Sequence, residues 1–266
     1  HSIQANVQVQ LAGGSIDAQI LHRCQQTLRM CVAGTAAAHV IHRQGGEIEG
    51  SAVTGSILLS GSAAAAGLLR QSQIADLLTV RENFGSLDAN TCVAYVGDGR
   101  NNVANSLMMG CAKAGVRYVC CAPASLRPDD AVLAEAEEVA KRNGVDIRVF
   151  EDPVQGVKGA NVLYTDVWVS MGEEDKTAER IKLLKPYQIN MDLMRATGNI
   201  DGKLMFLHCL PAFHDFNTDV TKESGALEVT DEVFESKYSK VFDESENRMH
   251  TIKALFVSAL CDRASI

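Results

Sequence analysis

The chain has 266 residues, 46% hydrophobic and 22% charged, so it is long enough to bury one large core or two smaller ones. Its 33 acidic and 25 basic residues give a net charge of −8, which argues against an electrostatic hold on nucleic acid or an anionic membrane. The sequence shows no apolar run of membrane-spanning length and no signal-peptide pattern at its start, so we expect a cytoplasmic protein that binds small molecules or other subunits.

The first 84 residues differ in composition from the rest. They contain no lysine, proline, tryptophan or tyrosine, and their arginine and acidic residues balance, so the net negative charge belongs to residues 85–266. Residues 51–69 are rich in Gly, Ser and Ala and show no clear period, which leaves a buried helix, a linker or an unfolded segment as alternatives. The apolar spacing of residues 73–83 predicts an amphipathic helix.

From residue 91 onward, buried-type strands alternate with helices. An apolar run at 91–96 predicts a strand, and a Gly-rich turn at 97–102 leads into a helix that ends near Ala114. Further strands are predicted at 117–122, 145–150, 161–165 and 203–207, and further helices at 128–143, 154–158, 177–184 and 244–260. This alternation predicts an α/β fold, a parallel sheet with helices on both faces, whose ligands bind at the carboxyl ends of the strands.

Eight cysteines are scattered along the chain, and none forms a Cys-x-x-Cys pair. Cys120 and Cys121 are neighbours in a predicted strand, so their side chains should point to opposite faces of the sheet. We therefore expect reduced thiols and no structural zinc site.

Unusual polar residues gather in four loops, at 97–102, 166–174, 208–214 and 246–250. The first offers small residues and the amides of a helix start, which suit an anion or a carboxylate. The second holds a carboxylate, the only Trp, a hydroxyl and a Gly, which suit an amine-bearing ligand. The third pairs a thiol with histidines, and the fourth carries an arginine that suits a phosphate or a carboxylate. Each loop taken singly also fits a structural role: a capping turn, an aromatic plug, a packed cysteine beside a histidine, or a solvated arginine.

Several common site motifs are absent from the sequence. Asn102 stands where a dinucleotide fingerprint needs its third glycine, and no acidic residue ends the second strand, which disfavours a nicotinamide dehydrogenase. No Walker-type phosphate loop and no Gly-x-Ser-x-Gly elbow occurs. His208 and Cys209 are adjacent without further ligands nearby, which disfavours a metal site.

Taken together, these loops and their flanks resemble the ornithine carbamoyltransferase family over roughly residues 74–262. The segments that carry the resemblance, in the family's order and spacing, are YVGDGRNNVANSLM (95–108), LYTDVWVSMGEE (163–174), RIKLLKPYQINMDLM (180–194), FLHCLPAFHD (206–215), LEVTDEVFES (227–236) and ENRMHTIKA (246–254). The resemblance implies a Rossmann-like ornithine-binding domain at 85–243, a C-terminal helix at 244–266 that returns toward a first domain, and a homotrimer or a multiple of trimers. It also implies transfer of a carbamoyl group from carbamoyl phosphate to the δ-amine of L-ornithine, with no metal or organic cofactor.

The resemblance assigns site residues as well. It implies that ornithine is bound by Asn102, Asp166, Ser170 and Met171. It places Cys209, Leu210 and Arg248 on the carbamoyl-phosphate side, with Asp166 and Cys209 as the catalytic pair.

The first 84 residues depart from the family. The family's first domain binds carbamoyl phosphate through a Ser-x-Arg-Thr motif and a His-Pro-x-Gln motif, and neither occurs here. We therefore expect residues 1–84 to be a truncated or atypical carbamoyl-phosphate domain. One hypothesis is that residues 1–73 derive from a frameshifted or misassembled reading of the gene, and the other two reading frames of the source DNA would then encode both missing motifs.

Two alternatives to an ornithine carbamoyltransferase follow. One is an impaired paralogue that keeps only amino-acid binding. The other is a carbamoyltransferase for another amine such as putrescine, which the sequence Ser-Met-Gly at 170–172 disfavours.

Overall fold

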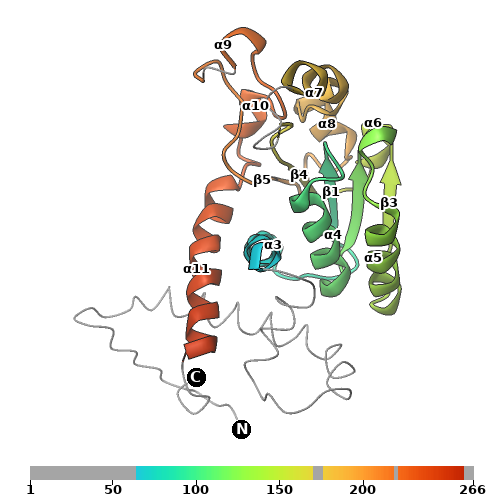
Figure 1. Ribbon diagram of the computed structural model, residues 1–266, viewed down its shortest axis with the longest axis vertical. Helices are drawn as coiled ribbons and strands as arrows, with labels where there is room; N and C mark the ends of the chain where they lie inside the picture. The colour runs from blue at the N-terminus through green and yellow to red at the C-terminus, as the bar shows by residue number, and fades with distance from the viewer. Residues whose placement is uncertain (1–63, 170–175, 219–220, 261–266) are drawn as a thin grey trace, which may run out of the picture. The chain divides into compact units, whose positions relative to one another are not determined.

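The computed structural model describes the backbone of residues 64–169, 176–218 and 221–260 (Figure 1). The chain divides into two compact units, one formed by His1–Leu78 with Glu246–Ile266 and the other by Thr79–Ser245. The boundaries fall within helix α3 (Ala64–Phe84) and helix α11 (Val241–Leu260). The domain limits drawn from the sequence, 1–84, 85–243 and 244–266, stay predictions.

The second unit is built around a parallel sheet, as the sequence predicts. Its strands are β1 (Cys92–Val96), β2 (Arg117–Cys121), β3 (Ile147–Phe150), β4 (Val162–Thr165) and β5 (Met205–His208). They lie in the order β3-β2-β1-β4-β5, and every neighbouring pair is parallel. The chain moves outward from β1 to β3 and then returns to the other side of β1 with β4. The carboxyl ends of β1 and β4 therefore flank the point where strand order reverses, which is where ligands of such sheets bind.

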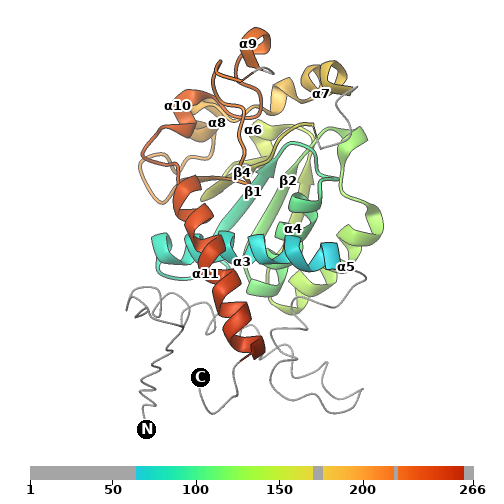
Figure 2. The same ribbon diagram turned by 60° about the vertical axis from the view of Figure 1, so that its left-hand side comes forward.

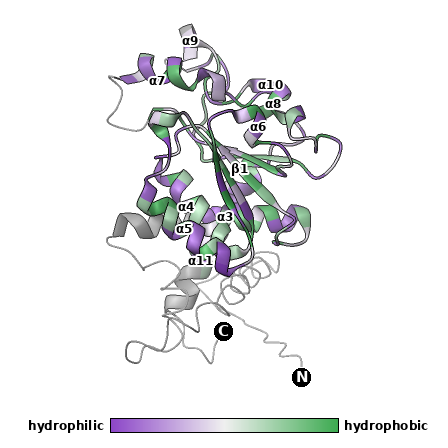
Figure 3. Cartoon of the chain, turned by 90° about the vertical axis from the view of Figure 1, so that its right-hand side faces the viewer, coloured by the Kyte–Doolittle hydropathy of each residue, from purple (hydrophilic) through white to green (hydrophobic). Residues whose placement is uncertain are grey.

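Helices cover both faces of the sheet. Figure 2 shows α4 (Asn102–Ala114) and α5 (Asp130–Arg142) in front of the strands, with α6 (Pro153–Gly156) and α8 (Met191–Ala196) behind them. Because both faces are covered, every residue of β1 and β4 is buried, and so are both Cys120 and Cys121. The outer helices α4 and α5 carry hydrophilic as well as hydrophobic residues (Figure 3), as helices with one solvent-facing side do.

The remaining elements of the second unit are short. They are the helices α7 (Thr177–Leu184), α9 (Thr221–Ser224) and α10 (Asp231–Phe234) and the 3-10 turns η3 (Ala124–Leu126) and η5 (Lys185–Tyr187). Of these, the sequence predicted only α7. Among the described residues, no helix is long and apolar enough to cross a membrane.

Local hydrogen bonds explain where element boundaries differ from the predicted ones. The α5 helix starts at Asp130 because the Asp129 carboxylate caps it, accepting the Ala131 amide at 2.9 Å. Strand β3 starts at Ile147, two residues late, because the Val145 amide donates to Ala140 O (3.0 Å) at the end of α5. Helix α3 is longer than predicted and begins at Ala64, so the part of the unpatterned stretch from residue 64 onward is helical.

Gly156 lies where the backbone of α6 packs against strands β2 and β3. A Cβ atom there would collide with Cys121 Sγ and would lie 3.1 Å from Phe150 Cβ. We expect Gly156→Ala to lower the free energy of unfolding by about 1–3 kcal/mol, the usual cost of overpacking a core. Urea denaturation measures this loss. Gly202→Ala is the matched control, since its Cβ would meet nothing closer than Asn199 O at 3.6 Å. Equal stabilities of the two variants would contradict the prediction.

Candidate functional site

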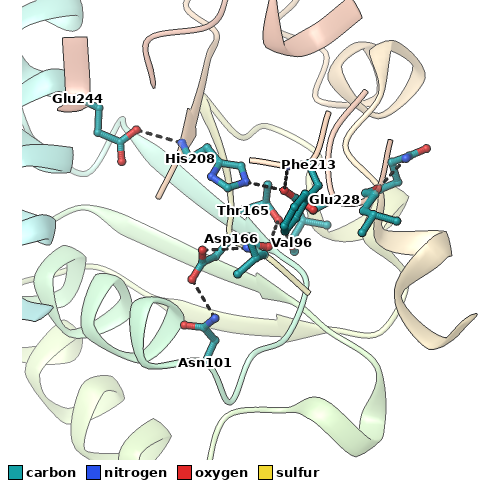
Figure 4. A network of polar contacts seen from close by, with 11 residues as sticks. Val96, Asn101, Thr165, Asp166, His208, Phe213, Glu228 and Glu244 are labelled. Atoms are coloured by element: carbon teal, nitrogen blue, oxygen red, sulfur yellow. Dashed lines mark hydrogen bonds and ion pairs between the residues drawn. The ribbon is translucent and has the colours of Figure 1, made fainter. Parts of the chain in front are cut away.

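The ends of β1 and β4 are tied together at the switch point of the sheet. The Thr165 hydroxyl donates to Val96 O at 2.7 Å and is fully buried (Figure 4). Gly97 follows β1 with φ 144°, a conformation that favours glycine, and its amide donates to Cys121 O. The chain therefore turns sharply after β1, and the start of α4 lies next to the end of β4.

Asp166 lies directly after β4, facing the start of α4. Its Oδ2 accepts a hydrogen bond from Asn101 Nδ2 at 2.9 Å, and its Oδ1 accepts the Val167 amide at 2.8 Å (Figure 4). Asn101 also caps α4, because its Oδ1 accepts the Val103 amide at 2.7 Å. A single asparagine therefore fixes both the start of a helix and the orientation of the predicted ornithine-binding carboxylate.

Asp166 is only 8% exposed, and this burial has the largest effect on the pKa of its carboxyl group. Desolvation raises the pKa of its carboxyl above the ordinary 3.8. His208 and the hydrogen bonds from Val167 and Asn101 oppose this rise, and the charge of Glu228 adds to it. A buried carboxylate with a raised pKa at a switch point is a typical functional group, both for pairing with an amine and for accepting a proton.

His208 ends β5 inside a buried polar network. Its Nε2 lies 3.1 Å from Glu228 Oε1, and both side chains are fully buried. Its amide donates to Glu244 Oε2 at 3.0 Å (Figure 4). Glu228 Oε1 also accepts the Phe213 amide at 2.6 Å. The network thus holds both ends of the loop that contains Cys209.

Cys209 and Asp166 lie at the same edge of the sheet. Thr165 pairs with His208 in the β4–β5 register, so the next residue of each strand emerges side by side. Cys209 is half-buried, and Leu210, also half-buried, packs against the main core. The Leu210–Pro211 peptide bond is cis.

Four further predicted site residues are Asn102, Ser170, Met171 and Arg248. Asn102 is the first residue of α4, and its side chain is exposed. Ser170 and Met171 lie outside the described residues. Arg248 belongs to the first unit, where it is exposed on α11.

Sequence reasoning missed two contacts of this site. Asn101 holds the Asp166 carboxylate, and its place near the end of the turn that leads into a predicted helix is the signal that could have identified it as a cap. Glu228 lies between the buried residues Leu227 and Val229, and a lone charge within an apolar run signals a buried partner.

One group of side chains has ligand atoms close enough together to hold a metal ion. His214, Asp231 and Glu235 offer atoms within 4.8 Å of one another among the described residues. His214 Nδ1 already pairs with Asp231 Oδ1 at 2.7 Å, and its ring stacks on Phe234 with centroids 3.8 Å apart. These contacts account for the position of the imidazole at the start of α10.

Comparison with known proteins finds matches in one family. Residues 89–259 match the family model "Aspartate/ornithine carbamoyltransferase, Asp/Orn binding domain". The chain is 56% identical over 193 residues to a catabolic ornithine carbamoyltransferase of Enterococcus faecalis, covering 70% of this chain and 57% of that protein. A second catabolic enzyme, from Bacillus licheniformis, is 56% identical over 195 residues, with 71% and 57% covered. The chain thus spans a little over half the length of these curated relatives.

Solved structures of the same family share the fold. The ornithine carbamoyltransferase of Pyrococcus furiosus superposes with a TM-score of 0.62 at 38% identity, covering 73% of this chain and 57% of that one. The anabolic enzyme of Campylobacter jejuni gives a TM-score of 0.60 at 29% identity, with 70% and 56% covered.

Proposed function

The chain belongs to the aspartate/ornithine carbamoyltransferase family, and from that premise we propose that it carries the ornithine site of an ornithine carbamoyltransferase. The reaction is transfer of the carbamoyl group from carbamoyl phosphate to the δ-amine of L-ornithine, which gives L-citrulline and phosphate. The observation that supports it best is Asp166, a buried carboxylate oriented by two hydrogen bonds at the switch point of the sheet.

The chemistry asks for a neutral amine next to a polarised carbonyl. The δ-nitrogen attacks the carbonyl carbon, a C–N bond forms, and the C–O bond to phosphate breaks with its electron pair leaving on the phosphate. An ammonium nitrogen gives up one proton before it attacks and a second once the C–N bond has formed, and the departing phosphate can accept the second. Burial makes the Asp166 carboxylate a stronger base than an ordinary aspartate, which suits it both to bind the ammonium form and to take its proton.

The remaining roles are part of the same proposal. Asn102, Ser170 and Met171 would bind the amino-acid end of ornithine, while Cys209, Leu210 and Arg248 would contact carbamoyl phosphate. The position of Cys209 beside Asp166 at the sheet edge supports its share in the reaction. The proposal includes a homotrimer or a multiple of trimers, which the family resemblance implies, and a cytoplasmic location, as expected from the sequence. It places the chain in arginine metabolism, and two relatives at 56% identity are named catabolic enzymes.

A second candidate function rests on the first 84 residues, which lack the family's two carbamoyl-phosphate motifs. A protein that binds ornithine without transferring a carbamoyl group fits that observation. Citrulline formation by the purified full chain, from ornithine and carbamoyl phosphate, separates the two. Turnover of about 1 per second or faster supports the transferase. Ornithine binding without turnover supports the binding protein, and turnover of putrescine in place of ornithine would contradict both.

Ornithine affinity is expected to fall as the pH is lowered, with a midpoint above 3.8, the ordinary aspartate pKa. The sign follows from the carboxyl group. Above the raised pKa Asp166 is a carboxylate and attracts the ammonium group, and below it the neutral acid does not. Calorimetric titrations across a pH series at constant ionic strength measure the midpoint. His208 and Glu228 also act on this carboxyl, so Asp166→Asn in the same series isolates its share. A wild-type midpoint at or below the ordinary value would contradict the prediction.

A further inference from the structure

An ion pair connects helix α7 with the turn between β1 and α4. Arg180 Nη1 donates to Asp98 Oδ2 at 2.9 Å, between residues 82 positions apart in the sequence. The Arg180 side chain is 8% exposed and that of Asp98 is 13% exposed. Removing one partner of such a buried ion pair destabilises the folded protein, because the other charge is left buried without a counter-charge.

Asp98 is the centre of the hydrogen bonds that shape this turn. Its Oδ1 accepts the Arg100 amide at 2.9 Å, and its backbone carbonyl accepts the Asn101 amide at 3.1 Å. Arg100 also approaches Oδ1, but its Nε lies 3.5 Å away and its side chain is 48% exposed, so solvent screens that contact. Arg180 is therefore the buried cation that faces the Asp98 carboxylate.

The turn ends in the residue that holds the candidate site. Asn101 caps α4 through Oδ1 and donates to the Asp166 carboxylate through Nδ2. A continuous series of contacts thus runs from the Arg180 guanidinium through Asp98 and the turn to Asn101 and Asp166. Arg180 itself comes from a helix anchored in the core by Leu184, which is fully buried.

We propose that Arg180 is a positioning residue for the ornithine site: by pairing with Asp98 it fixes the β1–α4 turn, and thereby sets Asn101 against the Asp166 carboxylate. The identity of the ligand in this inference rests on the proposed function. The effect of Arg180 on the β1–α4 turn, which we call the clamp, does not depend on it. In this proposal Arg180 does not touch ornithine and acts on the site through Asp98 and Asn101. Its loss should therefore weaken binding in the folded protein, by about tenfold or more, as removal of supporting groups around a site commonly does.

The test uses the full chain with Arg180→Gln, Arg180→Lys, Asn101→Ala and the double variant R180Q/N101A. The matched control is Arg195→Gln. Arg195 Nη1 also donates to an aspartate, Asp192, at 2.9 Å, but in an exposed pair on α8. Two quantities are measured: hydrogen exchange of the Arg100 and Val103 amides, which donate to the Asp98 and Asn101 side chains, and the dissociation constant for L-ornithine.

Arg180→Gln is expected to speed exchange at both amides and to weaken ornithine binding, whereas Arg195→Gln changes neither. The double variant should bind no more weakly than the weaker single variant, because both substitutions break the same series of contacts. Arg180→Lys keeps the charge and should recover part of the affinity, and it stands in if Arg180→Gln fails to fold.

Three results would overturn the proposal: unchanged exchange at both amides in the Arg180 variants, unchanged ornithine affinity despite faster exchange, or additive losses in the double variant. If the wild-type chain does not bind ornithine, the proposed function fails. The exchange data still decide whether Arg180 clamps the turn.

Discussion

Replacing Asp166 with asparagine is expected to remove most of the chain's affinity for L-ornithine. The substitution keeps the size of the side chain but removes the only charge that it offers to the ammonium group. Both oxygens of the Asp166 carboxylate accept hydrogen bonds, one from Asn101 Nδ2 and the other from the Val167 amide. In the asparagine variant an NH2 group replaces one of these oxygens and faces a donor in place of an acceptor. Truncating one partner of a desolvated charge pair costs about 2–5 kcal/mol, so the dissociation constant should rise by roughly 30-fold or more. Isothermal titration calorimetry measures this change directly.

The control for this substitution is Asp192→Asn on α8. The Asp192 side chain is 92% exposed and pairs only on the surface with Arg195, so its replacement should leave ornithine affinity unchanged. Wild-type affinity in the Asp166 variant would mean that ornithine binds elsewhere or does not use this carboxylate.

Glu228→Ala is expected to be the most destabilising single substitution in the polar network behind the site. Glu228 Oε1 is shared by the Phe213 amide and the His208 ring, and no part of this carboxylate side chain is exposed. Removing it leaves buried partners unsatisfied, at a cost of about 3–5 kcal/mol. Urea denaturation followed by tryptophan fluorescence measures the loss, since Trp168 is the only tryptophan and lies in the core of this unit.

Glu228→Gln is the matched comparison, because its amide oxygen still accepts the Phe213 amide. We expect it to lose much less stability than the alanine variant. Equal losses in both variants would show that the carboxylate charge, and not the acceptor atom, stabilises the loop. A loss under about 1 kcal/mol for alanine would contradict the role of Glu228 altogether.

The sheet could be predicted from the sequence because parallel strands that are buried on both faces consist of short, nearly continuous apolar runs. The runs at 91–96, 117–122 and 161–165 need no knowledge of their neighbours to be recognised, and each corresponds to a strand of the structure. Short helices such as α9 and α10 have four residues each and were missed. Too few residues lie in them for any apolar period to show.

The site could be predicted less completely than the fold. Asp166 directly follows one predicted strand and Cys209 lies two residues after another, so the sheet rule brings them to one end of the sheet without further information. The resemblance names Asn102 as an ornithine-binding residue and does not single out Asn101. Which of two adjacent asparagines caps the helix depends on backbone geometry. Asp98 and Arg180 are 82 positions apart in the sequence. Only the folded chain brings them together, so no local sequence pattern predicts their ion pair.

Calorimetric titration of the full chain with L-ornithine and with L-norvaline tests whether Asp166 binds the δ-amine. L-Norvaline has the same carbon skeleton as ornithine but lacks the δ-amine. If Asp166 forms an ornithine site, ornithine binds saturably at one site per chain, and norvaline binds at least about 30-fold more weakly. No saturable binding of ornithine, or equal affinity for both amino acids, would contradict the assignment of this carboxylate to the δ-amine.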